Sequence, residues 1–226
     1  MTTYKGIRGL TIRTVAGDPD PLITGDIWYS TATRKIRGAK IGAGAWASGG
    51  DLTTARGKHG TCGTYTAVLA SGGGGPYRAL VETYNGSTWT EVGDLNRSRL
   101  GLASSGTTTA ALSFGGYHSP SDPDGNKAET ELWDGSSWTE VGDLNTSRQN
   151  LTNLGSTSTA AVAIGGNIDN PGTAGNVSET WNGTSWTEGG NLNTARVSLG
   201  GAGAVDHGSV FGGGSPPTGA IAESYD

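Results

Sequence analysis

The chain has 226 residues, enough for one or two domains with a hydrophobic core. Its formal net charge of −5 provides no basic footprint for nucleic acid or for an anionic membrane surface. The 41 glycines and 15% charged residues are typical of tight turns and closely packed strands. Cys62 is the single cysteine, which excludes an intramolecular disulfide and a cysteine-based metal cluster.

Residues 1–44 differ in pattern from the rest of the chain. RGLTIRTV alternates at strand period, GDPDP interrupts it, and GDIWYSTATRKIRG predicts a hairpin with Ile27, Trp28 and Tyr29 on one strand. This segment is therefore expected to form a small β appendage. No leader pattern precedes it, and no run approaches the roughly 20 apolar residues that cross a bilayer, so we expect a soluble protein.

Residues 45–226 are built from a repeat. Trp89, Trp138 and Trp186 recur 49 and then 48 residues apart, each in a similar stretch of sequence, and a partial copy around Trp46 precedes them. A period of this length indicates a propeller or another array of stacked supersecondary units.

Each copy predicts four short antiparallel strands. An alternating segment ends at an Asn-Gly or Asp-Gly pair, which we expect to form a two-residue hairpin turn. A strand with the Trp follows, then a GDLN-type turn, an Arg-led inner strand and a small apolar strand that ends in Gly-Gly. A meander of about 45 residues has the size of one propeller blade.

The Gly-Gly pair, the aromatic residue two positions after a Glu and the Trp five positions later resemble the kelch repeat. The aromatic residues in question are Tyr84, Trp133 and Trp181. This resemblance covers residues 45–226 and implies an all-β, kelch-like β-propeller. The GDIWY hairpin in front of a Gly/Ser/Thr-rich array resembles segments near the start of tail-fibre and other virion proteins of bacteriophages.

The repeat also predicts how the propeller closes. The Trp46 strand is in surplus at the start, and the last copy stops at Asp226, before its own Trp strand. We expect the Trp46 strand to pair with the strand that ends at Tyr225, giving a ring of four blades without open edges. An eight-bladed ring shared by two chains would satisfy the same pattern, and this alternative stays open.

Two repeated side chains have both a structural and a binding interpretation. The tryptophans fit either a ring of sugar-stacking platforms or packing between blades, and the kelch-like pattern favours packing. Four arginines enter the inner strands and fit either an anion-binding ring or pairing with an acid of the repeat. Pairing is favoured because a feature found in every blade more often builds the blade. The arginines are Arg56, Arg99, Arg148 and Arg196, and the acids are Glu82, Glu131, Glu179 and Glu223.

The connections between Gly-Gly and the next Glu differ from copy to copy, and variable loops on a rigid scaffold often carry binding. In a kelch-like meander these loops emerge on one face, where two of them would be neighbours and suit polar recognition of a sugar or protein. Ordinary solvated loops are the alternative. The candidate residues are Tyr117, His118, Asp122, Asp124 and Asn126 on one loop, and Asn167, Asp169 and Asn170 on the next.

Metal binding and catalysis find little support in the sequence. Asp122, Asp124 and Asn126 alternate like calcium ligands, but the glycine is misplaced for an EF-hand, so no metal or cofactor is expected. The kelch-like copper oxidases need a Cys-Tyr pair and histidines, whereas His59, His118 and His207 have no ligand-like spacing. No nucleophile elbow, zinc helix or phosphate loop is present. We expect no enzymatic activity, although a glycosidase carboxylate pair cannot be judged from sequence.

The resemblances imply a non-enzymatic structural protein of the phage virion. Two hypotheses about its role compete. In the first, a tail fibre or spike displays the propeller for host-surface binding of a glycan or protein. In the second, a capsid decoration or tail adaptor protein has a purely structural role. In both, the N-terminal segment binds other virion proteins and the chain is a homo-oligomer without nucleic acid or membrane insertion. A cellular kelch-type interaction scaffold is a weaker third reading.

Overall fold

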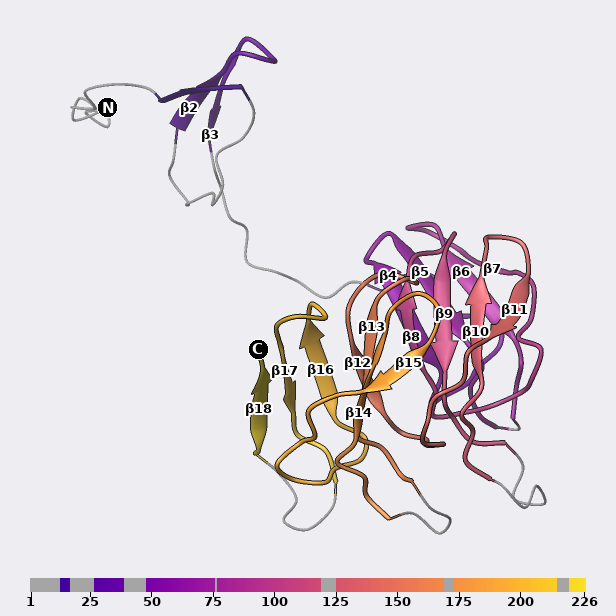
Figure 1. Ribbon diagram of the computed structural model, residues 1–226. Helices are drawn as coiled ribbons and strands as arrows, with labels where there is room; N and C mark the ends of the chain where they lie inside the picture. The colour runs from indigo at the N-terminus through magenta and orange to yellow at the C-terminus, as the bar shows by residue number, and fades with distance from the viewer. Residues whose placement is uncertain are drawn as a thin grey trace. The chain divides into compact units, whose positions relative to one another are not determined.

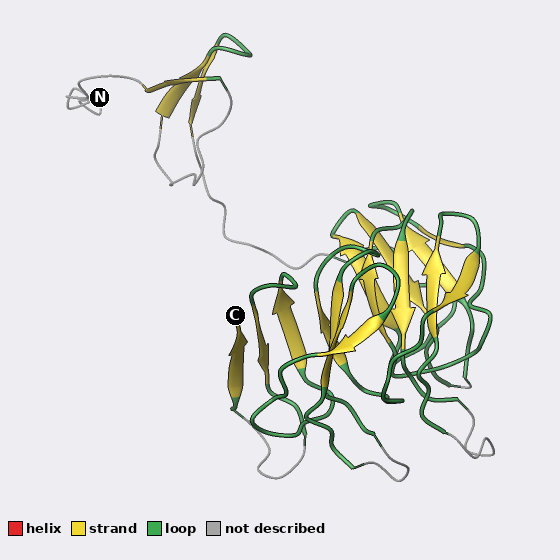
Figure 2. Cartoon of the chain, in the orientation of Figure 1, coloured by secondary structure: helices red, strands yellow, loops and turns green. Residues whose placement is uncertain are grey.

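The computed structural model describes residues 13–16, 27–38, 48–75, 77–118, 125–168, 173–214 and 220–226. The chain divides into two compact units, Met1–Ser48 and Gly49–Asp226. Both are built from strands (Figure 2). Among the described residues, no helix is long and apolar enough to cross a membrane.

The first unit contains a three-stranded sheet in the order β1-β2-β3. Its strands are β1 (Arg13–Val15), β2 (Ile27–Ser30) and β3 (Lys35–Gly38). The antiparallel β2–β3 pair confirms the hairpin expected from the sequence, and β1 runs parallel to β2. Within β2, Trp28 is buried while Ile27 is 49% exposed, so one apolar side chain of this small sheet faces solvent.

The second unit is a four-bladed β-propeller, as the repeat predicts (Figure 1). Blade 1 comprises β4 (Gly60–Thr64), β5 (Ala67–Ser71), β6 (Val81–Tyr84) and β7 (Trp89–Glu91). Blade 2 comprises β8 (Ala103–Gly106), β9 (Ala111–Phe114), β10 (Thr130–Trp133) and β11 (Trp138–Val141). Blade 3 comprises β12 (Thr152–Leu154), β13 (Ala161–Ile164), β14 (Ser178–Trp181) and β15 (Trp186–Glu188). Blade 4 comprises β16 (Gly200–Gly203), β17 (Gly208–Phe211) and β18 (Ala222–Tyr225).

The hairpin between the third and fourth strand of a blade is longer than the sequence suggests. Tyr84 pairs with Trp89, so the loop contains four residues and the two-residue turn expected at Asn85-Gly86 is wrong. The Asn85 carboxamide oxygen accepts hydrogen bonds from the backbone amides of Ser87 and Thr88, and only Gly86 has a positive φ, of 96°. The Asn85 side chain thus makes hydrogen bonds that backbone groups would make in a tighter turn. Asn and Asp are favoured in turns for this reason.

Three apolar cores lie between consecutive blades, one at each junction. The core between blades 1 and 2 contains Leu69 and Val81 from blade 1 together with Trp133 and Trp138 from blade 2. The core between blades 2 and 3 is centred on Phe114, whose ring lies 4.8 Å from that of Trp186. Packing of the repeated Trp between blades is therefore confirmed for Trp138 and Trp186, which are 6% and 5% exposed.

Blade 4 differs from the others at its outer side. Its sheet ends at β18, with no fourth strand among the described residues. Phe211 pairs with Ala222 as Phe114 pairs with Thr130, yet Phe211 is 50% exposed whereas Phe114 is buried. The closing strand that the sequence analysis assigns to Trp46 lies outside the described residues, so pairing of the terminal strands stays a prediction.

The burial of Trp138 between blades 1 and 2 predicts that this side chain contributes strongly to the stability of the fold. Trp138→Ala removes an indole that is 6% exposed and donates a hydrogen bond from Nε1 to the Gly93 carbonyl at 2.9 Å. We expect the free energy of unfolding to fall by about 3–5 kcal/mol, as for other buried aromatic truncations. Chemical denaturation measures this loss, with Tyr65→Ala, at a side chain that is 90% exposed, as the neutral control. An unchanged melting temperature of the Trp138 variant would contradict its place in the core.

Candidate functional site

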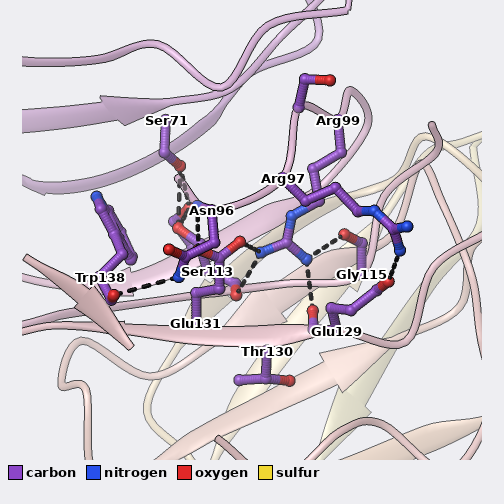
Figure 3. A network of polar contacts seen from close by, with 12 residues as sticks. Ser71, Asn96, Arg97, Arg99, Ser113, Gly115, Glu129, Thr130, Glu131 and Trp138 are labelled. Carbon is purple, nitrogen blue, oxygen red and sulfur yellow. Dashed lines mark hydrogen bonds and ion pairs between the residues drawn. The ribbon is translucent and has the colours of Figure 1, made fainter. Parts of the chain in front are cut away.

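The four repeated arginines are structural centres of the blades. Arg99 is buried, and its Nη2 donates to Glu131 Oε1 at 2.7 Å while its Nη1 donates to the Gly115 carbonyl at 2.9 Å (Figure 3). Arg148 binds Glu179 and Arg196 binds Glu223 in the same way, at 2.7 and 2.8 Å, and Arg56 pairs with Glu82. The pairing alternative of the sequence analysis is confirmed, and these guanidinium groups lie inside the sheets.

Each acid of the repeat also holds the turn that enters its blade. The second oxygen of Glu131 accepts the backbone amide of Asn96 at 2.6 Å, and Glu179 and Glu223 accept Asn145 and Asn193 at 2.7 Å. Burial tends to raise the pKa of Glu223, but hydrogen bonds from Asn193 and the charge of Arg196 outweigh it, so its pKa lies below the usual range. Glu82 has a lowered pKa for the corresponding reasons, with Thr53 and Arg56 as partners.

A cavity lies between the inner strands of all four blades. Its volume is about 350 Å³, and its walls carry hydroxyl, amide and glycine groups, including Thr61, Ser104 and Asn153. None of the four arginines and no other charged side chain of the described residues lines it. Cys62 lies on its wall, and burial raises the pKa of this thiol to about 12, so the sulfur stays protonated and unreactive at neutral pH.

The loops after Gly-Gly gather side chains from neighbouring blades on one face. Tyr117 and His118 of blade 2 lie beside Tyr77 of blade 1, with ring centroids 5.9 and 6.0 Å apart. His118 Nδ1 lies 2.6 Å from the carbonyl oxygen of Ser98, and since that oxygen only accepts, Nδ1 carries the proton. Tyr77 was missed by the sequence analysis because its loop gives no signal beyond its variability.

The two candidate loops meet, as predicted. Asn126 Nδ2 donates to the carbonyl of Asn167 at 2.9 Å, which joins the loop of blade 2 to that of blade 3. The backbone of Asn126 forms a bridge with Tyr117, so the aromatic group lies next to the Asn126–Asn167 contact. The remaining candidates, Asp122, Asp124, Asp169 and Asn170, lie outside the described residues, and the possible calcium loop lies with them.

Beside this surface lies a polar pocket on blade 2. It has a volume of about 410 Å³ and is lined by Arg97, Asn126, Glu129, Asp143 and Ser147, among others. Arg97 forms an ion pair with Glu129, and both residues line the pocket (Figure 3). Within the described ranges, no three His, Cys, Asp or Glu side chains come together as a metal site.

Comparison with known proteins adds no family assignment. The chain matches no protein-family model, and no curated protein matches its sequence.

The lowered pKa values of Glu82 and Glu223 predict how stability depends on pH. An unfolded glutamate titrates near pH 4.3, above the folded value, so the stability that these groups contribute is fully present above about pH 5. It is lost as the pH falls below about 4.3 and through the lowered folded pKa, because the unfolded chain binds protons first. Urea unfolding measured from pH 7 to pH 3 should show this decline.

Glu223→Gln identifies the carboxylate responsible. The variant should be about 1.5–3 kcal/mol less stable at pH 7, since Arg196 loses a charged partner, and its stability should fall less steeply in acid. Equal acid slopes for the variant and the unmodified protein would contradict this assignment.

Proposed function

We propose that this chain is a non-enzymatic, kelch-like propeller component of a bacteriophage virion, acting in a tail fibre or spike that binds the host surface. The observation that carries the proposal is the loop face, where Tyr77, Tyr117 and His118 lie beside the Asn126–Asn167 contact. Aromatic and polar side chains on adjoining loops of a rigid scaffold suit recognition of a glycan or protein. The phage context itself rests on the resemblance of the N-terminal hairpin.

The N-terminal segment supplies the attachment in this proposal. Ile27, Trp28 and Tyr29 form one strand, and the exposed Ile27 offers an apolar contact to another virion protein. A purely structural role, as a decoration or adaptor protein, is the second candidate. It is favoured by the exposed Phe211 on a blade whose last strand, β18, pairs with β17 but has no described partner on its outer side, since such edges suit assembly with other chains.

Closure of the ring by the Trp46 strand belongs to the same proposal, and described residues support it. Trp89 of blade 1 donates from Nε1 to the Gly50 carbonyl, just as Trp138 of blade 2 donates to Gly93. Gly93 follows the outer strand of blade 1, so Gly50 occupies the position that follows the outer strand of a preceding blade. In a closed ring that preceding blade is blade 4.

Immunogold electron microscopy of phage particles from the source tests the function. Antibody against the propeller should label a fibre or the tail tip. Label over the head or along the tail shaft would instead support the structural role, and particles without label would refute the virion assignment.

A disulfide tests the closure. By the register of Leu132 with Thr139, Ser224 should face Ala47, at a spacing that suits a disulfide. In a Cys62→Ala background, Ala47→Cys with Ser224→Cys should form an intramolecular bond, read by mass spectrometry and non-reducing gels. Ala47→Cys with Ala222→Cys, which lies further along β18, is the control that should not cross-link. An interchain bond would indicate the shared eight-bladed ring, and no bond would refute strand pairing.

A further inference from the structure

Blade 2 departs from the repeat at a position that is apolar elsewhere. In all four blades the carbonyl of one residue accepts a hydrogen bond from the first glycine of the Gly-Gly pair. The residues at this position are Leu80, Glu129, Val177 and Ile221. Because the backbone contact is common to all, the scaffold does not require a carboxylate at Glu129.

Blade 2 also differs from the other blades at Arg97, the residue that pairs with Glu129. Arg97 lies two residues before the structural Arg99, and the other three blades have Thr54, Thr146 and Thr194 at that position. Arg97 pairs with Glu129 through one carboxylate oxygen, Oε1. The other oxygen, Oε2, is buried and has no hydrogen-bond partner in the described part of the chain.

A third difference of blade 2 from the repeat is Asn126, which carries another buried hydrogen-bond acceptor without a described donor. Asn126 is 3% exposed, and its Nδ2 is engaged by the Asn167 carbonyl. Its Oδ1 is buried and has no donor among the described residues. Blades 1 and 3 have Tyr77 and Ala174 at this position, one residue before the amide that bonds to the Gly-Gly pair.

These side chains line the same pocket, which has a volume of about 410 Å³. This lies within the size range of small-ligand sites. Lys127, Asp143 and Ser147 also line the pocket, and the Arg97–Glu129 pair lines a smaller hollow of about 280 Å³ as well. Arg97 is 46% exposed at its side chain, so solvent and ligands reach the pair.

We propose that this pocket, named here the blade-2 pocket, binds one sugar residue of a surface carbohydrate. Sugar hydroxyls donate to Asn126 Oδ1 and Glu129 Oε2, and a hydroxyl oxygen accepts from the Arg97 guanidinium. A hydroxyl group suits this wall because it both donates and accepts, whereas Arg97 disfavours a cation in the same space. The inference rests on the proposed host-binding function and assigns that function to particular residues.

Repeat-matched substitutions test the assignment without disturbing the scaffold. Glu129→Val, Asn126→Ala and Arg97→Thr each introduce the residue of blade 3. Gln149→Val, which introduces the blade 4 residue on the same loop face but outside the blade-2 pocket, is the matched control. Circular dichroism and the melting temperature establish that each variant is folded.

The probe is an array of bacterial lipopolysaccharide and capsule oligosaccharides, followed by calorimetry with the oligosaccharide that binds best. Each pocket variant should bind roughly tenfold more weakly for each hydrogen bond lost, and Gln149→Val should bind like the unmodified protein. If the unmodified protein binds a glycan and the folded pocket variants bind it equally well, the pocket assignment is wrong but glycan recognition stands. If the unmodified protein binds no oligosaccharide of the array, both the pocket assignment and glycan binding are refuted.

Discussion

The propeller depends on the ion pair that each blade buries between the segment leading into its first strand and its third strand. The strands contain three to five residues and many small side chains, so each sheet offers little apolar surface of its own. An arginine that reaches across a sheet fixes several strands at once: Arg99 binds Glu131 and also the carbonyls of Gly115 and Ser113. Burying the two charges costs desolvation free energy, and these additional hydrogen bonds offset it. Removing either partner would leave an uncompensated buried charge.

The backbone of Arg148, one of the structural arginines, also connects one blade to the next. The backbone carbonyl of Arg148 accepts a hydrogen bond from Gly116 of the preceding blade at 2.8 Å. Gly115, beside it, has a φ of 68°, and a β-carbon there would lie 2.8 Å from that carbonyl. The Gly-Gly pair is thus required by the approach of the next blade, as well as by the left-handed backbone. One arginine thus holds the sheet and the neighbouring blade, and its partner glutamate holds the turn.

The sequence predicted most of this architecture because a repeat amplifies weak local signals. The blade count, the strand order and the pairing of arginine with glutamate follow from features that recur in register. The length of the turn at Asn85 could not be predicted in this way, because an Asn carboxamide can replace backbone hydrogen bonds in several turn types. Tyr77 and Arg97 were missed because each occurs in a single copy and its neighbours become visible only after folding. The serine cluster of Ser71, Ser104 and Ser113 was likewise invisible, since the three hydroxyls meet across two blades.

Repetition also separates structural from functional polar atoms. The Nε atoms of all four structural arginines are buried without a hydrogen-bond partner among the described residues, which makes this a shared feature of the blade. The buried acceptors on Asn126 and Glu129 also have no hydrogen-bond partner within the described ranges, but they belong to one blade only. A buried acceptor without a donor costs roughly 1–3 kcal/mol. A fold that places apolar residues at the Glu129 position in its other blades has no structural need for that cost, so a ligand that supplies the donors explains why blade 2 retains it.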